Sequence, residues 1–226
     1  MSYRRRNVMA IGAHPDDIEF GCSGTLSNHI DVGDNVIMVV MTNTESVDGV
    51  TGEILRTKEE NQEEARCSAK VIGCDIEFLS FKDLHVPFSF ESVSQLEYLI
   101  KKHDIDTIYT HWAGDANQDH IATFKTTMAA GRYVPNVFCY EQIPIPRVSE
   151  NSINPNYYVD VTKSFDNKIE ASSCHKSQIK KYKSHGFDVP KNLKTLAEFR
   201  GIQANCEYAE AFQVIKMVGG KNEYRI

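Results

Sequence analysis

The feature that most constrains the fold is the alternation of apolar, strand-like runs with helix-like segments through the first two-thirds of the 226-residue chain. These runs are apolar almost throughout, which is typical of strands whose two faces are both covered. Strands of this kind, separated by helices, form a parallel sheet. We therefore expect an α/β, Rossmann-like fold with an open, mostly parallel sheet and helices on both faces. The predicted strands are Asn7–Ala13, Asn35–Asn43, Asp75–Phe81 and Thr107–Trp112.

The segments between these strands carry helix-like patterns with glycine stops. The predicted helices are Gly24–Gly33, Ile54–Gly73, Ser92–Asp104 and His120–Arg132. The pattern then loosens into two strand-like segments (Val137–Ile143 and Tyr157–Thr162), a helix (Ser164–Tyr182) and a helix that leads into a closing strand (Leu193–Ile215). No linker rich in Pro, Gly or Ser divides the chain, so we expect one domain over residues 1–226.

Bulk composition narrows the class of protein. The net charge of −6 gives no reason to expect nucleic acid or an anionic membrane as a partner. No apolar run approaches the roughly 20 residues of a membrane helix, and the N-terminus has no export pattern. The six cysteines are dispersed, which predicts reduced, mostly buried thiols in a cytoplasmic protein and argues against a zinc ribbon. They are Cys22, Cys67, Cys74, Cys139, Cys174 and Cys206.

Two polar clusters stand where predicted strands end. The stretch AHPDDIEF supplies His14, Asp16 and Asp17, and the stretch THWAGDANQDH supplies His111, Asp115, Asn117, Asp119 and His120. Parallel strands place such ends at one edge of the sheet, where open α/β folds bind ligands. Taken singly, each cluster is more typical of a polar turn or a helix cap than of a metal site. Taken together, imidazole, carboxylate and imidazole are suitable ligands for a divalent metal ion, and one further carboxylate remains to act as a base.

The stretch AHPDDIEFGCSGTL resembles the signature of the LmbE-like or PIG-L family of zinc-dependent N-acetylglucosaminyl deacetylases. NQDHIAT and YAEAF resemble later motifs of the same family. The resemblance implies one zinc ion per chain, held by His14, Asp17 and His120. It also implies that Asp16 is the general base, because a carboxylate that is not a ligand can take a proton from water and pass it to the leaving amine.

One position departs from the family pattern. Many members have His-x-x-His at the second motif, whereas this chain has Asn117 at the first of those positions. The Asn117 amide and the His111 imidazole are therefore both candidates to stabilise the oxyanion. Asp119 and Asp115 are candidates to orient the ligand imidazoles, Asp119 because it adjoins His120.

Several other polar residues allow two interpretations. For Glu210, Arg132 and Glu141 we weigh a structural ion pair against a contact with substrate. The remaining histidines lack a ligand-like context and are interpreted as surface or packing residues. They are His29, His85, His103, His175 and His185.

The implied activity is hydrolysis of the N-acetyl group of a GlcNAc-like amino sugar, in a glycan or a nucleotide-sugar precursor, with release of acetate. Two alternatives are a metal-dependent phosphoesterase and a non-catalytic sugar- or nucleotide-binding domain. The expected partner is a small amino-sugar molecule, with no nucleic acid and no membrane. The resemblance also points to a homo-oligomer, a trimer or hexamer. We expect loops to set substrate specificity, namely Thr44–Glu53, Phe81–Ser92 and Ile143–Tyr157.

Overall fold

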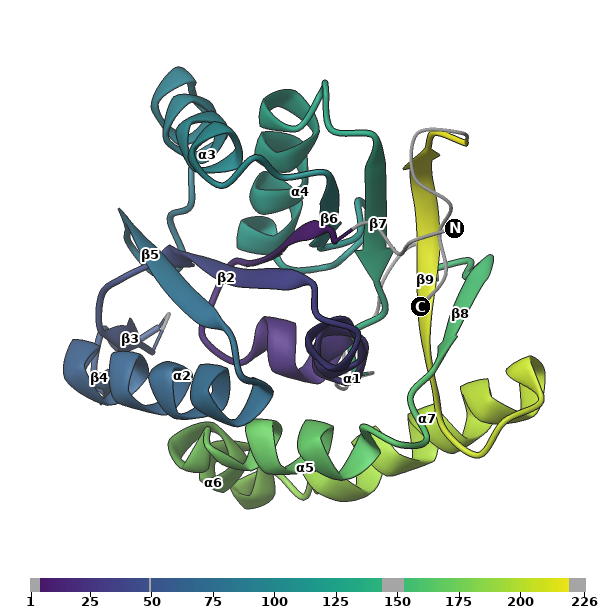
Figure 1. Cartoon of the computed structure of the whole chain (residues 1–226). Coiled ribbons are helices and arrows are strands. Elements are labelled where there is room, and N and C mark those ends of the chain that lie inside the picture. The colour runs from purple at the N-terminus through teal and green to yellow at the C-terminus, as the bar shows by residue number, and fades with distance from the viewer. Residues whose placement is uncertain (1–4, 49, 144–152, 220–226) are drawn as a thin grey trace.

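The computed structural model describes residues 5–48, 50–143 and 153–219, so most of the predicted loop Ile143–Tyr157 lies outside the described residues. A seven-stranded sheet in the order β5-β2-β1-β6-β7-β9-β8 forms the centre of the molecule (Figure 1). The first five strands of this order are parallel, and β9 runs antiparallel between β7 and β8. The strands are β1 (Asn7–Gly12), β2 (Asn35–Thr42), β5 (Asp75–Phe81), β6 (Thr107–Thr110), β7 (Asn136–Tyr140), β8 (Tyr157–Asp160) and β9 (Ala209–Met217), with a separate hairpin of β3 (Ser46–Val47) and β4 (Ile54–Arg56).

Helices cover both faces of the sheet, as the apolar strands predict. Figure 1 shows α3 and α4 on one face and α1 and α2 on the other, with α5, α6 and α7 beyond them. Along β1, Val8 and Ala10 face one hydrophobic core, and Met9 and Ile11 face the other. The helices are α1 (Asp17–Asp31), α2 (Lys58–Ile72), α3 (Phe90–Lys102), α4 (Gln118–Ala130), α5 (Phe165–Ser173), α6 (Lys176–Ser184) and α7 (Val189–Ala204). Within the described residues, none of them is long and apolar enough to cross a membrane.

Two segments that were each predicted as a single helix are divided in the structure. The segment predicted as one helix from Ile54 begins as strand β4, and α2 starts only after Thr57. Thr57 and Glu60 form a capping box, a sequence signal that fixes this start and that the prediction overlooked. The predicted helix Ser164–Tyr182 is two helices, α5 and α6, because the backbone of His175 is not helical.

Helix α1 differs most from its prediction, because it begins at Asp17 and has non-helical dihedral angles at Cys22. Glu210 accepts hydrogen bonds from the backbone amides of Gly24 (3.0 Å) and Thr25 (2.7 Å), just past this break. The ammonium of Lys168 lies 2.6 Å from Glu210 and donates to the backbone carbonyl of Phe20 (2.9 Å), just before it. The buried ion pair therefore supplies partners to both ends of the interrupted helix.

We predict that Glu210→Ala lowers the free energy of unfolding by about 3–5 kcal/mol, because it leaves the buried Lys168 ammonium without its counter-charge. Urea unfolding followed by circular dichroism measures this loss. Glu97→Ala is the matched control, since it removes an ion pair with Arg132 at the surface and should cost much less. Equal losses in the two variants would show that the buried pair has no special structural role.

The prediction of six reduced thiols is wrong for one pair of cysteines. Cys67 on α2 and Cys174 at the end of α5 form a disulfide, with their Cα atoms 5.8 Å apart. The prediction failed because cysteines 107 residues apart carry no local signal of pairing. The other four cysteines are free, and of these Cys22 and Cys139 are buried.

We predict that Cys67→Ser lowers the free energy of unfolding by about 2–4 kcal/mol, because the cross-link restricts the unfolded chain. Urea unfolding with and without reductant measures the effect, and Cys206→Ser, which removes a free thiol, is the control. Wild-type protein unfolded without reductant should release four thiols to a thiol reagent. Release of six would contradict the cross-link.

Candidate metal centre

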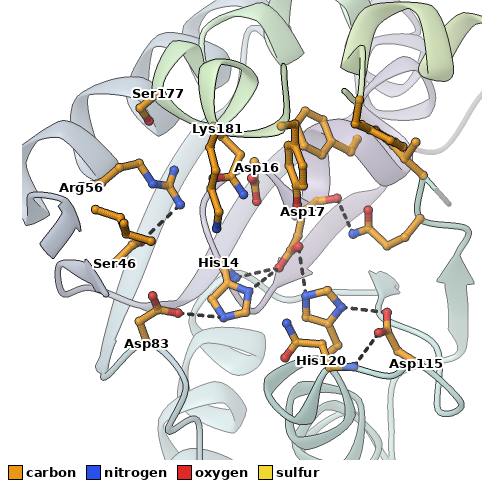
Figure 2. Close-up of a pocket in the computed structure, with 18 of the residues that line it drawn as sticks. His14, Asp16, Asp17, Ser46, Arg56, Asp83, Asp115, His120, Ser177 and Lys181 are labelled. Atoms are coloured by element: carbon orange, nitrogen blue, oxygen red, sulfur yellow. Dashed lines mark hydrogen bonds and ion pairs between the residues drawn. The ribbon is translucent and has the colours of Figure 1, made fainter. Parts of the chain in front are cut away.

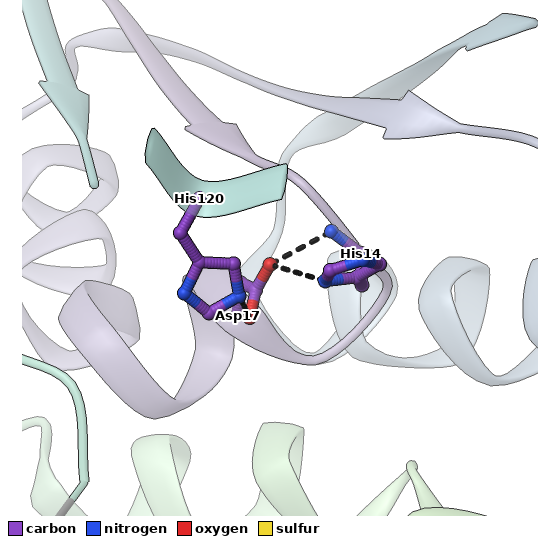
Figure 3. Close-up of side chains that lie close together, drawn as sticks. All are labelled: His14, Asp17 and His120. Atoms are coloured by element: carbon purple, nitrogen blue, oxygen red, sulfur yellow. Dashed lines mark hydrogen bonds and ion pairs between the residues drawn. The ribbon is translucent and has the colours of Figure 1, made fainter. Parts of the chain in front are cut away.

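The two polar clusters meet because β1 and β6 are neighbouring parallel strands. The chain passes from β1 to β2 and β5 on one side and continues with β6 on the other, so the strand order reverses between β1 and β6. His14 follows β1, Asp17 begins α1, and His120 lies in the first turn of α4. One ligand atom from each of these three side chains lies within 4.8 Å of the other two (Figure 3).

Hydrogen bonds determine which nitrogen of each imidazole faces Asp17. The Nε2 atom of His14 lies 3.0 Å from Asp119 and 3.2 Å from Asp83, and the Nδ1 atom of His120 lies 2.8 Å from Asp115. The opposite nitrogens approach the Asp17 carboxylate, His14 Nδ1 at 3.4 Å and His120 Nε2 at 3.2 Å. Each imidazole thus has a carboxylate behind it, the usual arrangement for histidines that bind metal ions.

The sequence identified two of these orienting carboxylates but misassigned one partner. Asp119 adjoins His120 in the chain, yet its carboxylate contacts His14, and Asp115 contacts His120. Asp119 is the second residue of α4, so its side chain points in a different direction from that of the next residue. Asp83 was missed, although it lies two residues beyond β5 and the same strand-end rule would have found it.

The electrostatics of the cluster favour positive charge at its centre. Burial lowers the pKa of His120, but the Asp17 and Asp115 carboxylates outweigh this effect and raise it to about 9. Burial raises the pKa of Asp17, but His120 and His111 outweigh it and hold the pKa well below its usual range. A divalent cation between these donors would supply the positive charge that the carboxylates attract, so the residues present fit a zinc ion.

Asp16 differs from its neighbour Asp17 in its hydrogen-bond partners and in the direction of its pKa shift. It is buried, its Oδ2 atom has no hydrogen-bond partner within the described residues, and it lines the cavity beside the cluster. Burial and the charge of Asp17 raise its pKa to about 6. Its backbone has φ 106°, a conformation that costs about 1–3 kcal/mol in a residue other than glycine and that concentrates at functional sites.

The structure separates the two candidates for stabilising an oxyanion. Asn117 lines the cavity, and its side-chain oxygen caps α4 by accepting from the Asp119 amide at 2.9 Å, which leaves its NH₂ group available to donate. His111 is fully buried behind Asp17, and its Nε2 atom lies 2.9 Å from the Ala13 amide. Burial and the nearby His120 lower the pKa of His111 to about 4. The same Nε2 atom lies 3.1 Å from the Asp17 carboxylate.

The cluster opens into a cavity of about 750 Å³, which Figure 2 shows with His14, Asp17 and His120 at its base. A cavity of this size can hold a drug-sized ligand. Its walls come from β3 and β4, from the loops after β5 and β6, and from α6. Apolar side chains among the lining residues are Phe20, Leu55, Leu84, Trp112, Ile143 and Phe187.

The three residues for which we weighed a structural ion pair against a contact with substrate all form ion pairs in the fold. Glu210 pairs with Lys168, Arg132 pairs with Glu97, and Glu141 pairs with Arg200. Two of the remaining histidines are buried and paired with acids, His29 with Asp34 and His175 with Glu19. Of the others, His85 and His185 are exposed, and His103 is partly buried beside Glu77.

Fold and cluster together define an α/β protein with a candidate metal centre at the carboxyl edge of its parallel strands. The chain belongs to the PIG-L (LmbE-like) family of deacetylases, because the family model described as GlcNAc-PI de-N-acetylase matches residues 9–131. It is 34% identical over 186 residues to the uncharacterized deacetylase YaiS of Escherichia coli, covering 77% of this chain and 92% of YaiS. It is 25% identical over 228 residues to the diacetylchitobiose deacetylase of Thermococcus kodakarensis, covering 93% and 83% of the two chains.

The same fold occurs in a solved structure with a different activity. The 4-carboxy-2-hydroxymuconate hydratase GalB of Pseudomonas putida superposes with a TM-score of 0.79, at 21% identity, over 97% of this chain and 100% of GalB. At this identity the likeness shows the fold alone. The reaction must therefore be argued from the side chains of the site.

We predict that the purified protein binds about one zinc ion per chain and that His120→Ala loses most of it, because three protein ligands leave little redundancy. Asp115→Asn should weaken zinc affinity about 10–100-fold, since it removes the carboxylate behind His120. Elemental analysis and competition with a chromogenic chelator measure these effects. His85→Ala, which removes an exposed histidine, should bind zinc normally. Unchanged zinc content in His120→Ala would exclude this site.

Proposed function

We propose that this protein is a zinc-dependent hydrolase that removes the acetyl group from the amino nitrogen of an N-acetyl amino sugar and releases acetate. The observation that carries the proposal is the pairing of a convergent ligand set with the unpartnered, buried carboxylate of Asp16 in one cavity. The named activity of the diacetylchitobiose deacetylase relative supports an acetylated sugar as substrate.

In this proposal His14, Asp17 and His120 hold the zinc ion through the atoms that converge in Figure 3. When bound, zinc would supply a Lewis acid that polarises the acetyl carbonyl and makes water more acidic. Asp119 and Asp83 orient His14, and Asp115 orients His120, so both imidazoles keep a fixed direction and tautomer.

Asp16 is the general base. Asp16 lines the cavity, its Oδ2 atom has no hydrogen-bond partner within the described residues, and its raised pKa lies closer to neutral pH, where proton transfer to and from a carboxylate is most effective. It accepts a proton from the attacking water and returns that proton to the nitrogen of the departing amine. The two carboxylates therefore have separate roles, because Asp17 is engaged with three imidazoles.

Asn117 is the side chain of this chain that donates to the oxyanion. Its NH₂ group is free within the described residues, whereas its oxygen is committed to the helix cap. Removal of a single donor of this kind typically costs about 10²–10³ in turnover. His111 supports the site from behind in the tautomer that carries its proton on Nε2, which then donates to the Asp17 carboxylate at 3.1 Å.

A phosphoesterase is less well supported, because such enzymes commonly use two metal ions about 3.5–4 Å apart. The three candidate ligand groups of the described residues share His14 or His120, and their additional carboxylates already contact those imidazoles. A non-catalytic binding domain would have no use for the buried, unpartnered Asp16, which raises the energy of the fold.

We predict that zinc-loaded protein releases acetate from N-acetylglucosamine derivatives and N,N′-diacetylchitobiose. Asp16→Asn should retain zinc and fold normally, yet lose about 10²–10⁴ in turnover, mainly in kcat, because Asp16 acts in the transition state. Mass spectrometry detects the loss of one acetyl group, and elemental analysis detects the metal.

The Asp17→Asn variant distinguishes the loss of a metal ligand from the loss of the base. That variant removes a charged ligand from the neighbouring position, so it should lose zinc and activity together. If Asp16→Asn also loses its zinc, or retains near-normal turnover, Asp16 is not the base. If no acetylated sugar releases acetate, the proposed function fails.

A further inference from the structure

We propose that the Cys67–Cys174 disulfide is a redox switch, which holds helix α6 against the cavity when oxidised and releases this helix when reduced. Release of α6 weakens the binding of substrate and leaves the metal centre in place. The switch does not depend on which reaction the protein catalyses, and only its effect on turnover rests on the proposed function.

The disulfide joins two elements that border the cavity. Cys67 lies on α2 and Cys174 directly follows α5, with their Cα atoms 5.8 Å apart. Helix α6 begins two residues after Cys174 and forms one wall of the cavity, where Figure 2 labels Ser177 and Lys181. The residues of α6 that line the cavity are Ser177, Gln178, Lys180, Lys181, Tyr182 and Ser184. The disulfide therefore fixes the point at which this wall starts.

Helix α6 has little packing of its own to hold it in place. The structure describes all nine of its residues, and among them only Gln178 is buried. Ile179 and Tyr182 are partly buried, against a small apolar cluster that is separate from the two cores of the sheet. Helices in proteins are stabilised mostly by the packing of an apolar face, and nine residues are too few for a stable isolated helix. The position of α6 thus depends on how its N-terminal end is attached.

The second attachment of α6 is noncovalent and also comes from α2. Glu64 accepts hydrogen bonds from the Ser177 amide at 2.8 Å and from the Ser177 hydroxyl at 2.7 Å. Glu64 lies three residues before Cys67, so both attachments leave α2 from the same face. Hydrogen bonds near the surface open locally and close again, whereas a covalent bond does not. Reduction would therefore leave α6 with an attachment that opens.

The residues next to the two cysteines contact one buried carboxylate. The Nε2 atom of His175 lies 2.9 Å from Glu19, and the Ser68 hydroxyl donates to the same carboxylate. Opening of the junction would return these buried polar groups to water, which offsets part of the contacts that opening breaks. Glu19 itself stays in place, because Lys168 donates to its backbone carbonyl at 3.2 Å. The junction can therefore open while the start of α1 keeps its position.

Thiol–disulfide exchange can open the cross-link in the folded protein. Cys67 is exposed, whereas Cys174 is only 8% exposed, so a dithiol reductant attacks the Cys67 sulfur. This attack forms a mixed disulfide and releases Cys174 as a thiolate, which takes up a proton, and the second thiol of the reductant then displaces Cys67. The protein disulfide gains two electrons and two protons, and the dithiol becomes a disulfide. Exposed disulfides are commonly the regulatory ones.

Hydrogen–deuterium exchange of oxidised and reduced protein tests the release of α6. Native protein is reduced with dithiothreitol, freed of the reagent without oxygen and reloaded with zinc. Alkylation should modify both Cys67 and Cys174 while the circular dichroism spectrum is retained. Peptides from residues 176–187 should then exchange about fivefold faster or more, whereas peptides from β1 and β6 should not change. Cys67→Ser should behave like reduced protein, and Cys206→Ser, which removes a free thiol, like oxidised protein.

Turnover of N,N′-diacetylchitobiose measures the effect on the cavity. We expect KM to rise about fivefold or more in reduced protein and in Cys67→Ser, with little change in kcat or zinc content, and reoxidation should restore the KM of wild type. Unchanged exchange in α6, an equal increase throughout the protein, or reduction only after unfolding would overturn the switch. If no sugar releases acetate, the proposed function fails, and the exchange measurement alone decides whether α6 is released.

Discussion

The geometry of the candidate centre depends on the interruption of helix α1. A continuous helix would bury no unpaired backbone groups at Cys22, whereas the observed break leaves amides and carbonyls that need partners. Lys168 and Glu210 supply those partners from α5 and β9. Because one ion pair connects both ends of the break to distant parts of the chain, it fixes the short first segment of α1, and with it Asp16 and Asp17, against the sheet. Glu210 thus helps to hold the segment that carries Asp16 and Asp17 in place.

A second constraint on the site is that several carboxylates contact the same imidazole. His14 contacts Asp17, Asp83 and Asp119, each from a different segment of the chain. No one of these contacts would orient the ring by itself, but together they leave it a single direction. The same carboxylates concentrate negative charge around a small space, which explains why this edge of the sheet suits a cation.

Much of the fold could be predicted from the sequence, because apolar runs bounded by polar strand ends carry a local signal. The proposed metal ligands could be predicted for the same reason, because His14 and His120 both stand in recognisable motifs near strand ends. Features that depend on tertiary contacts had no such signal. The break at Cys22 is stabilised by Glu210, which lies 186 positions beyond Gly24, and Cys67 pairs with a cysteine 107 positions away. Arg56 lines the cavity and was missed because it stands in a short strand that was predicted as helix.

The residues proposed for the chemistry and the residues that line the rest of the cavity come from different elements of the fold. The proposed ligands and base come from the ends of the central strands and the helices that follow them, where packing on two cores limits change. Part of the cavity lining comes from β4 and α6. These elements lie outside the central sheet (Figure 1). Substitutions in those outer elements can alter the charge of the cavity without disturbing the strand ends. Relatives with the same centre but different outer elements should therefore share a reaction and differ in the charge of the molecules they accept.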